Sequence, residues 1–311
     1  MPDRTMRALV QPDVAPGEWT VRQSAQQIES RRLMRMKLFV MFTIAKQELV
    51  INLRNKWIVM FALVFGALVV SISYFGMIAE GFSGMQNFTR TSASILNLVL
   101  YIVPLVSLTM GTLSFTGDKG STELLFSQPV SRSEVLTGKL FGLFLAIASA
   151  TLIGFTAAGA IVVAGNGPEG LLQYGFFVLL SLALSLVFLS MSVVVATLNR
   201  RKSKAFGVSM FLWFFFVLFY DLLTIGGTMM LKGQSANTFL FLSLFGNPVD
   251  MVRVATLISL DNVTIFGAAG AAMLRFLGGA GMSISLLVLG LATWTFLPMG
   301  ISHLILKKQD I

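Results

Sequence analysis

The chain has 311 residues, of which 55% are hydrophobic and only 12% are charged. Because soluble domains average about 25% charged residues, this composition excludes an ordinary soluble fold. The chain has no cysteine, which excludes disulfides, iron–sulfur ligation and thiolate zinc sites. Its net charge of +9 indicates membrane topology and contact with anionic lipid headgroups, and does not indicate binding to nucleic acid.

Residues 1–35 are expected to form a disordered extension, because they contain three prolines and many polar residues and show no apolar periodicity. Residues 36–56 instead predict an amphipathic helix that lies in the membrane interface. This helix is expected to turn into the membrane at Trp57. Its apolar stripe has helical spacing and consists of Phe42, Ala45, Leu49, Leu53 and Trp57.

Six stretches, uncharged except for one acid in the fifth and one histidine in the sixth, are each long enough to cross a membrane, which takes about 18 residues. They run over Trp57 to Ala79, Thr91 to Gly117, Leu140 to Pro168, Gly170 to Asn199, Ala205 to Leu231 and Phe276 to Leu306. The sequence therefore predicts an all-α integral membrane protein with six transmembrane helices within residues 57–306. Residues 307–311 are expected to form a short tail.

The distribution of basic residues predicts the orientation of these helices. If the N-terminus is cytoplasmic, nineteen of the 23 Lys and Arg residues fall in cytoplasmic segments. The four on the outer side are Arg90, Lys232, Arg253 and Arg275. Because cytoplasmic loops carry an excess of basic residues, both termini are predicted to face the cytoplasm.

A polar segment, residues 118–139, separates the second and third predicted spans. Ser121, Thr122 and Glu123 predict the start of a short helix with an acid in its first turn, and Pro129 ends it. The apolar residues of this helix are Leu124, Leu125 and Phe126. Two interpretations are open: a plain surface loop, or a docking helix whose apolar cluster fits a groove on a partner.

A second helix is predicted to begin within the same segment. Ser131 and Glu134 have the spacing of a capping box, in which each residue hydrogen-bonds the backbone of the other. The helix is expected to continue through Arg132 and Lys139 into the third span.

The stretch TELLFSQPVSRSEVLTGKL, residues 122–140, resembles the TLELLLSxPVSRxxxLxGK segment of type-2 ABC transporter permeases. The stretch IAKQELVINLRNKWI, residues 44–58, resembles the elbow helix that opens them. The resemblance covers residues 36–311. It implies an elbow helix, six spans, a cytoplasmic coupling helix in the polar segment and a partly re-entrant outer loop at residues 232–275.

The same resemblance implies partners. Such a permease pairs with a second copy of itself and contacts a cytoplasmic ABC ATPase through its coupling helix. It implies a multi-pass protein of the bacterial or archaeal cytoplasmic membrane. The residues expected to carry the contact with the ATPase are Glu123, Leu124, Leu125, Phe126, Pro129, Arg132, Glu134 and Lys139.

The chain contains no phosphate-binding loop of the form Gly-x-x-x-x-Gly-Lys-Ser/Thr; the nearest stretch is SEVLTGKL, residues 133–140. We therefore expect no enzymatic activity and no cofactor in this chain, with ATP and Mg²⁺ bound by the partner ATPase. The alternative is a channel or secondary carrier that works alone. Such a carrier usually has charges in several spans, whereas this chain has one intramembrane acid.

That acid is Asp221, beside Tyr220 in the fifth predicted span. A titratable group at membrane depth is a candidate functional site, because it is costly there and faces the bundle interior or water. The alternative is a residue at the outer interface that caps a re-entrant turn near Gly226 and Gly227.

No metal site is predicted. The only histidine, His303, has no Cys or acid near it in the sequence and is expected to be a packed or interfacial side chain. Seventeen methionines raise the possibility of Cu(I) binding, but they are scattered and also serve as apolar filler.

The outer loop, residues 232–275, is too broken by glycine and proline to span the membrane as one helix. Thr238 to Phe245 could enter the membrane as a short helix and Val249 to Leu260 could return as another, sheltered by the other helices. Asn247 and Pro248 mark the turn between them.

Two charges in this loop are predicted to pair. Asp250 would lie in the first turn of the returning helix, where it could cap the helix, and Arg253 would bind it three residues later. The stretches FFFVLFYDLLTIGG and NPVDMVRVATL, residues 214–227 and 247–257, resemble the NosY family of permeases. That family serves copper-site maturation of nitrous oxide reductase, which implies a periplasmic binding protein that rests on the outer loop, at Asn247, Pro248, Asp250 and Arg253.

Overall fold

A computed structural model describes residues 16–79, 85–116, 131–167, 170–199, 201–260 and 278–308. Every regular element in these residues is a helix, which confirms the all-α prediction. Six helical segments are long and apolar enough to cross a membrane. They are α2 (Lys56–Ala79), α3 (Met85–Phe115), α5 (Arg132–Asn166), α6 (Leu171–Leu198), the continuous run of α7 (Lys202–Phe214), the π-helical η1 (Phe215–Phe219) and α8 (Tyr220–Met230), and α12 (Ala280–Lys308).

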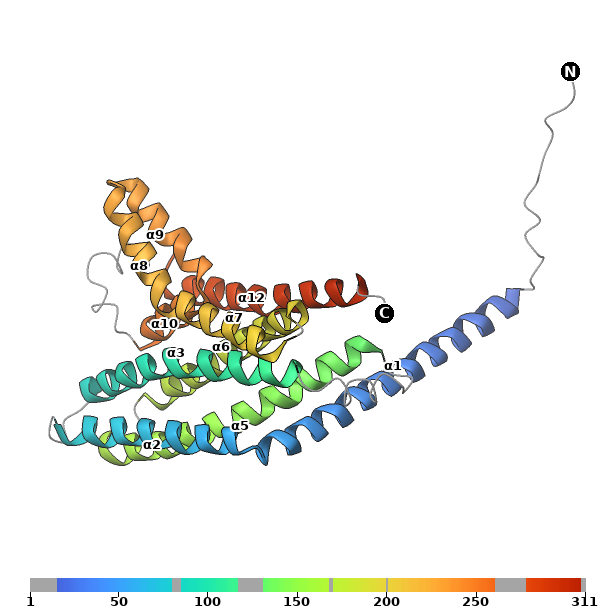
Figure 1. Ribbon diagram of the computed structural model, residues 1–311, viewed down its shortest axis with the longest axis horizontal. Helices are drawn as coiled ribbons and strands as arrows, with labels where there is room; N and C mark the ends of the chain where they lie inside the picture. The colour runs from blue at the N-terminus through green and yellow to red at the C-terminus, as the bar shows by residue number, and fades with distance from the viewer. Residues whose placement is uncertain are drawn as a thin grey trace, which may run out of the picture.

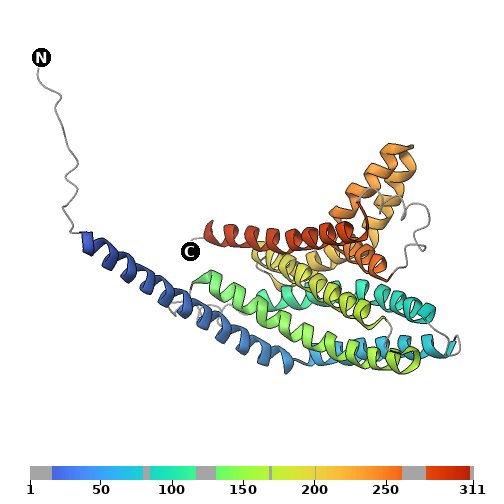
Figure 2. The ribbon, with the colours of Figure 1, turned by 180° about the vertical axis from the view of Figure 1, so that it is seen from behind.

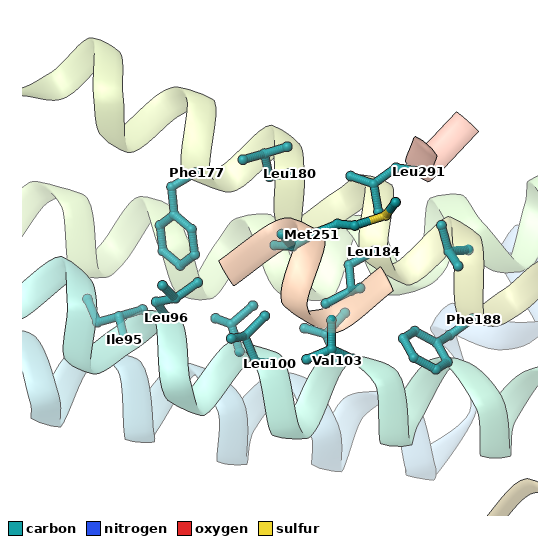
Figure 3. Close-up of a cluster of buried hydrophobic side chains, with 14 of the residues drawn as sticks. Ile95, Leu96, Leu100, Val103, Phe177, Leu180, Leu184, Phe188, Met251 and Leu291 are labelled. Atoms are coloured by element: carbon teal, nitrogen blue, oxygen red, sulfur yellow. The ribbon is translucent and has the colours of Figure 1, made fainter. Parts of the chain in front are cut away.

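The six predicted spans are found at the expected places. Their apolar parts run for 21 to 32 residues, which is enough for a hydrocarbon core that needs about 20. They form a bundle whose buried core draws side chains from α2, α3, α5, α6, α10 and α12. Figure 3 shows this core, in which side chains from α10 and α12 meet those of α3 and α6. The labelled residues are Ile95, Leu96, Leu100, Val103, Phe177, Leu180, Leu184, Phe188, Met251 and Leu291.

The N-terminal helix is longer than predicted. Helix α1 spans Pro16–Leu53, so the expectation of disorder over residues 1–35 is wrong for residues 16–35; residues 1–15 lie outside the described part. All three prolines of this region stand at or before position 16, and Pro16 is the first helical residue, where no backbone N–H is needed. After Gly17 the helix contains neither glycine nor proline, so nothing interrupts it.

The elbow lies slightly before the predicted position. Helix α1 ends at Leu53 and α2 begins at Lys56, so the chain turns over Arg54 and Asn55. The Asn55 Oδ1 atom accepts a hydrogen bond from the Trp57 backbone N–H at 3.0 Å, which satisfies one of the free donors of the new helix.

The two ends of the bundle differ in what they carry. Figures 1 and 2 show α1 running out past the end at which the C-terminus lies, while α8 and α9 project from the opposite end. The last residues of α3 and the first residues of α5 lie at the first end (Figure 1). We call the first end inner and the opposite end outer, following the predicted orientation.

The outer loop contains the two predicted short helices. They are α9 (Gln234–Gly246) and α10 (Pro248–Ser259), and they meet at an angle of 106°. Helix α10 is buried on nearly every side, because it packs against α6, α12 and α3. Residues 261–277 of the loop lie outside the described part.

Candidate functional site

A cluster of four polar side chains, which we call the outer cluster, joins α8 to the break between α9 and α10. The Arg253 Nη1 atom lies 2.6 Å from Asp250 Oδ1 and 3.2 Å from Asp221 Oδ2. The predicted pairing of Asp250 with Arg253 is therefore confirmed. That Asp221 shares the same guanidinium was not predicted, although one intramembrane acid and one arginine in the outer loop were available as a signal.

Asn247, the fourth member, connects the cluster to the backbone. Its Oδ1 accepts from the Val249 N–H at 3.0 Å, so Asn247, and not Asp250, is the N-cap of α10. Its Nδ2 donates to Asp250 Oδ2 and to the Phe216 carbonyl oxygen, both at 2.9 Å. Asn247 is fully buried, and all its hydrogen-bonding atoms are used.

The carbonyl that Asn247 binds belongs to the π-helical turn η1. Such turns replace the regular backbone ladder over a few residues and often occur at functional sites. Here η1 directly precedes Tyr220 and Asp221, so it sets the direction from which Asp221 reaches Arg253. The five residues of η1 are all apolar, and their sequence contains no signal for the π-helical turn.

The break after α9 exposes carbonyl groups that two neighbouring spans satisfy. The Tyr220 hydroxyl donates to the Ser243 carbonyl at 2.7 Å, and Trp294 Nε1 donates to the Phe245 carbonyl at 3.0 Å. A side chain at Gly246 would collide with the Tyr220 hydroxyl and push it away from the Ser243 carbonyl. Both donors meet the requirement that backbone groups at membrane depth find partners within the protein.

The outer cluster carries two carboxylates and one guanidinium, so it is negative by one charge when all three groups are ionised. The side chains of Asp250 and Arg253 are 15% and 23% exposed, while Asp221 is 36% exposed. In the absence of Arg253 the two acids would repel each other in a poorly solvated site. Arg253 therefore holds α8 and α10 together, and Asp221 is the more exposed of the two acids.

Asp221 does not cap a re-entrant turn near Gly226 and Gly227. Helix α8 continues without interruption through both glycines to Met230. The predicted capping of a re-entrant turn is therefore wrong, and Asp221 instead faces a partner charge in the protein.

The positions of the outer-cluster residues suit a role inside the bundle better than contact with a partner protein. Asn247 and Pro248 are buried, so in this conformation they cannot form a surface on which a partner rests. One exposed part of the outer end is the turn between α8 and α9, where Met229 and Met230 are 81% and 88% exposed. Among the described residues, no three His, Cys, Asp or Glu side chains gather as metal ligands.

At the inner end, the structure describes only part of the predicted ATPase-contact set. Glu123, Leu124, Leu125, Phe126 and Pro129 lie outside the described residues. The predicted capping box is confirmed: Ser131 Oγ accepts from the Glu134 N–H, and Glu134 Oε2 accepts from the Ser131 N–H, both at 3.3 Å. Arg132 is the first residue of α5.

Two further side chains at this end have partners that were not predicted. The Lys139 Nζ atom donates to the Ser114 carbonyl of α3 at 2.7 Å. His303 Nδ1 lies 2.8 Å from Ser133 Oγ, so this histidine is a packed side chain, as expected, and it joins α12 to the first turn of α5.

Comparison with known proteins identifies the family. The family of ABC-2 transporter proteins matches residues 28–311 of this chain. A probable ABC transporter permease protein NosY of Pseudomonas aeruginosa is 33% identical over 279 residues, which cover 88% of this chain and 99% of the relative. A protein of the same name from Stutzerimonas stutzeri is 33% identical over 276 residues, covering 86% and 98%. The chain therefore belongs to the ABC-2 transporter family, as a NosY-like permease subunit of an ABC transporter.

Proposed function

We propose that this permease couples ATP hydrolysis by a separate cytoplasmic ATPase to transport, or to force transmitted toward a periplasmic partner, in copper-site maturation of nitrous oxide reductase. The observation that carries the proposal is the likeness to NosY proteins, which extends over 99% of the length of one relative. It includes both the polar segment and the outer loop.

The polar segment is the proposed contact with the ATPase. Its apolar residues Leu124, Leu125 and Phe126 would enter a groove on the ATPase, which binds the ATP and Mg²⁺. Behind it, the capping box starts α5, a helix of 35 residues that extends about 50 Å toward the outer end. A push on the polar segment would therefore act directly on a helix that crosses the whole bundle.

The proposed assembly contains two copies of the permease in a bacterial or archaeal cytoplasmic membrane. A chain with one polar segment can serve two ATPase subunits only as a two-fold dimer. The fifth span supports this arrangement, because only 17% of its membrane-length window is buried, against 67% in α6. Its outward aromatic residues offer a face for a second copy, and they include Phe211, Phe214 and Phe219.

At the outer end, we propose that the outer cluster receives the movement that the ATPase starts at the polar segment. The break between α9 and α10 and the π-helical turn are held by side chains, so a shift of α10 against α8 would require Arg253 to change partners. Such a shift would move the exposed turn between α8 and α9, on which a periplasmic binding protein could act.

The contact with the ATPase is tested by a pull-down from membranes. The double variant Leu125→Asp and Phe126→Asp should insert normally but recover little ATPase, because charge would enter an apolar contact. The variant Gln128→Glu adds a charge to the same segment without removing an apolar residue and serves as the matched control. Undiminished recovery with the double variant would refute docking through this cluster.

The role in maturation is tested in a host that lacks its own copy of the permease. Nitrous oxide reductase purified from cells that express this chain should contain its full complement of copper, and enzyme from cells without it should not. Equal copper content in both would contradict the maturation role and would favour a type-2 exporter for another small molecule or lipid.

A further inference from the structure

The inner end contains a second polar cluster, formed by Glu48 and Asn52 of α1, Ser114 of α3 and Lys139 of α5. We call it the inner cluster. Ser114 Oγ donates to Glu48 Oε1 at 2.8 Å, and Lys139 Nζ donates to the Ser114 carbonyl oxygen at 2.7 Å. Ser114 thus stands between an acid and a base and binds each of them through a different oxygen.

The Glu48 carboxylate is held from a second direction. Asn52 Nδ2 donates to Glu48 Oε1 at 2.9 Å and to the Glu48 carbonyl oxygen at 2.9 Å. Asn52 is itself only 5% exposed. Hydrogen bonds to an ionised group are stronger than those between neutral groups, so the carboxylate is fixed on the side of α1 that faces the bundle.

The inner cluster contains a residue from each side of the polar segment. Ser114 lies just before the polar segment, and Lys139 is the last residue of that segment. The hydrogen bond between them therefore links α3, just before the polar segment, to α5, where the segment ends. The hydrogen bond from Ser114 to Glu48 then links the same point to α1.

Helix α1 also packs on α5 without intervening side chains. Gly138 and Gly142 stand four residues apart, on one face of α5. A side chain at Gly138 would meet the Met41 carbonyl oxygen, and one at Gly142 would meet the Ala45 carbonyl oxygen. Small residues at this spacing let helix backbones come into direct contact. These contacts keep α1 beside α5, whereas the hydrogen bonds of the inner cluster fix the position of α1 along α5 and α3.

We propose that Glu48, Ser114 and Lys139 are positioning residues that transmit displacement of the polar segment to α1, so that α1 and α5 move as one body when the ATPase binds ATP. This inference rests on the proposed function, because it needs a partner that moves the polar segment. It adds a second route: besides pushing α5, the ATPase would turn α1 and, through the elbow at Asn55, the first span.

The alternative is that the inner cluster only fastens α1 to the bundle. The two cases differ in what a weakened cluster changes. A fastening role lowers stability or detaches α1, whereas transmission is lost while the protein stays folded and bound to the ATPase. The glycine contacts keep α1 in place when one hydrogen bond is removed, so the two roles can be separated.

The experiment uses the full permease with its ATPase in lipid nanodiscs. The chain has no cysteine, so Gln47→Cys on α1 and Leu172→Cys at the outer start of α6 provide two unique sites for spin labels. Both positions are exposed. In the labelled parent, the distance between the labels should shift when ATP is added. Glu48→Leu, Ser114→Ala and Lys139→Met, each made in the labelled parent, should lose this shift while the ATPase still copurifies and hydrolyses ATP.

The matched control is Ser114→Thr, which keeps both the hydroxyl and the carbonyl and should keep the shift. Because the three residues act in series, the double variant Glu48→Leu with Lys139→Met should lose no more than either single variant. A full ATP-dependent shift in Glu48→Leu and Ser114→Ala would overturn the proposal. Loss of the ATPase or a large fall in melting temperature in these variants would also overturn it, in favour of fastening. A labelled parent that recovers no ATPase would instead reject the proposed function.

Discussion

The two ends of the bundle both carry polar clusters, but the helices around them differ. At the outer end the backbone is irregular: η1 is π-helical, and α9 and α10 meet at 106°. Side chains there have to supply the hydrogen bonds that the backbone lacks. At the inner end α3 and α5 are regular helices, and the side chains of the inner cluster only connect one helix to another. Removing a polar side chain should therefore affect folding at the outer end and coupling at the inner end.

The largest effect on stability is expected at Asn247. The variant Asn247→Leu loses the N-cap of α10 and leaves the Phe216 carbonyl and one Asp250 oxygen without a donor. An N-cap is worth about 1 kcal/mol and an unsatisfied buried group about 1–3 kcal/mol, so the loss should reach about 3 kcal/mol. Thermal melting of the purified protein in detergent measures it. Asn237→Leu, on an exposed position of α9, is the control and should change little.

A melting temperature for Asn247→Leu equal to that of Asn237→Leu would mean that the α9–α10 break does not depend on this side chain. The distinction between a folding role at the outer end and a linking role at the inner end would then fail.

The next largest effect on stability is expected at Gly142, where α1 and α5 pack closely at the inner end. Gly142→Val would place a side chain against the Ala45 carbonyl oxygen, which is backbone and cannot move aside. Overpacking of this kind typically costs about 1–3 kcal/mol. The control is Gly207→Ala on α7, where a Cβ meets no atom within 4 Å and a helical glycine is replaced by a better helix former.

Gly207→Ala should therefore melt at the same temperature as the parent or slightly higher, while Gly142→Val melts lower and exposes α1 to proteolysis. Equal protease resistance of α1 in both variants would show that α1 does not depend on the glycine face of α5.

The fold was more predictable than the sites, for a physical reason. Spans are specified by long apolar stretches, and all six were found; caps are specified by short spacing rules, and the Ser131–Glu134 capping box was found. The Asp250–Arg253 pair also follows from spacing within one helix. Contacts between elements distant in sequence, such as Asp221 with Arg253 or Ser114 with Glu48, depend on how helices pack. No local pattern encodes that packing.

The prediction of disorder for residues 16–35 was wrong for a related reason. Three prolines and many polar residues suggested a chain that cannot fold, but all the prolines precede the helix. What remained after Gly17 was an unbroken run of residues that a helix tolerates. The positions of the prolines carried the information, and their number did not.

A smaller difference is expected within the outer cluster itself. Asp250 lies closer to Arg253 than Asp221 does, at 2.6 Å against 3.2 Å, and it is less exposed, at 15% against 36%. Asp250→Asn should therefore lower stability by about 1 kcal/mol, and Asp221→Asn, whose charge is better solvated, by about half of that. Melting curves at low and high salt would separate the two.

Added salt should reduce the cost of Asp221→Asn more than that of Asp250→Asn, because water and ions reach the exposed pair more easily. The reverse order, with Asp221→Asn the more damaging, would assign the main structural pairing to α8. The proposal that Arg253 can change partners when α10 shifts would then lose its basis.

The smallest effect is expected for Ser133 and His303, which join α5 to α12 at the inner end by one hydrogen bond of 2.8 Å. Ser133 lies in the first turn of α5, which the Ser131–Glu134 capping box already caps, so the bond connects the two helices without supporting either. Ser133→Ala and His303→Phe should each lower stability by less than about 1 kcal/mol, the net value of an ordinary hydrogen bond. Since each substitution removes the same bond, the double variant should be no less stable than the weaker single variant. A cost near 3 kcal/mol for Ser133→Ala would equal that of Asn247→Leu. It would show that regular helices at the inner end depend on polar side chains as much as the broken helices at the outer end do.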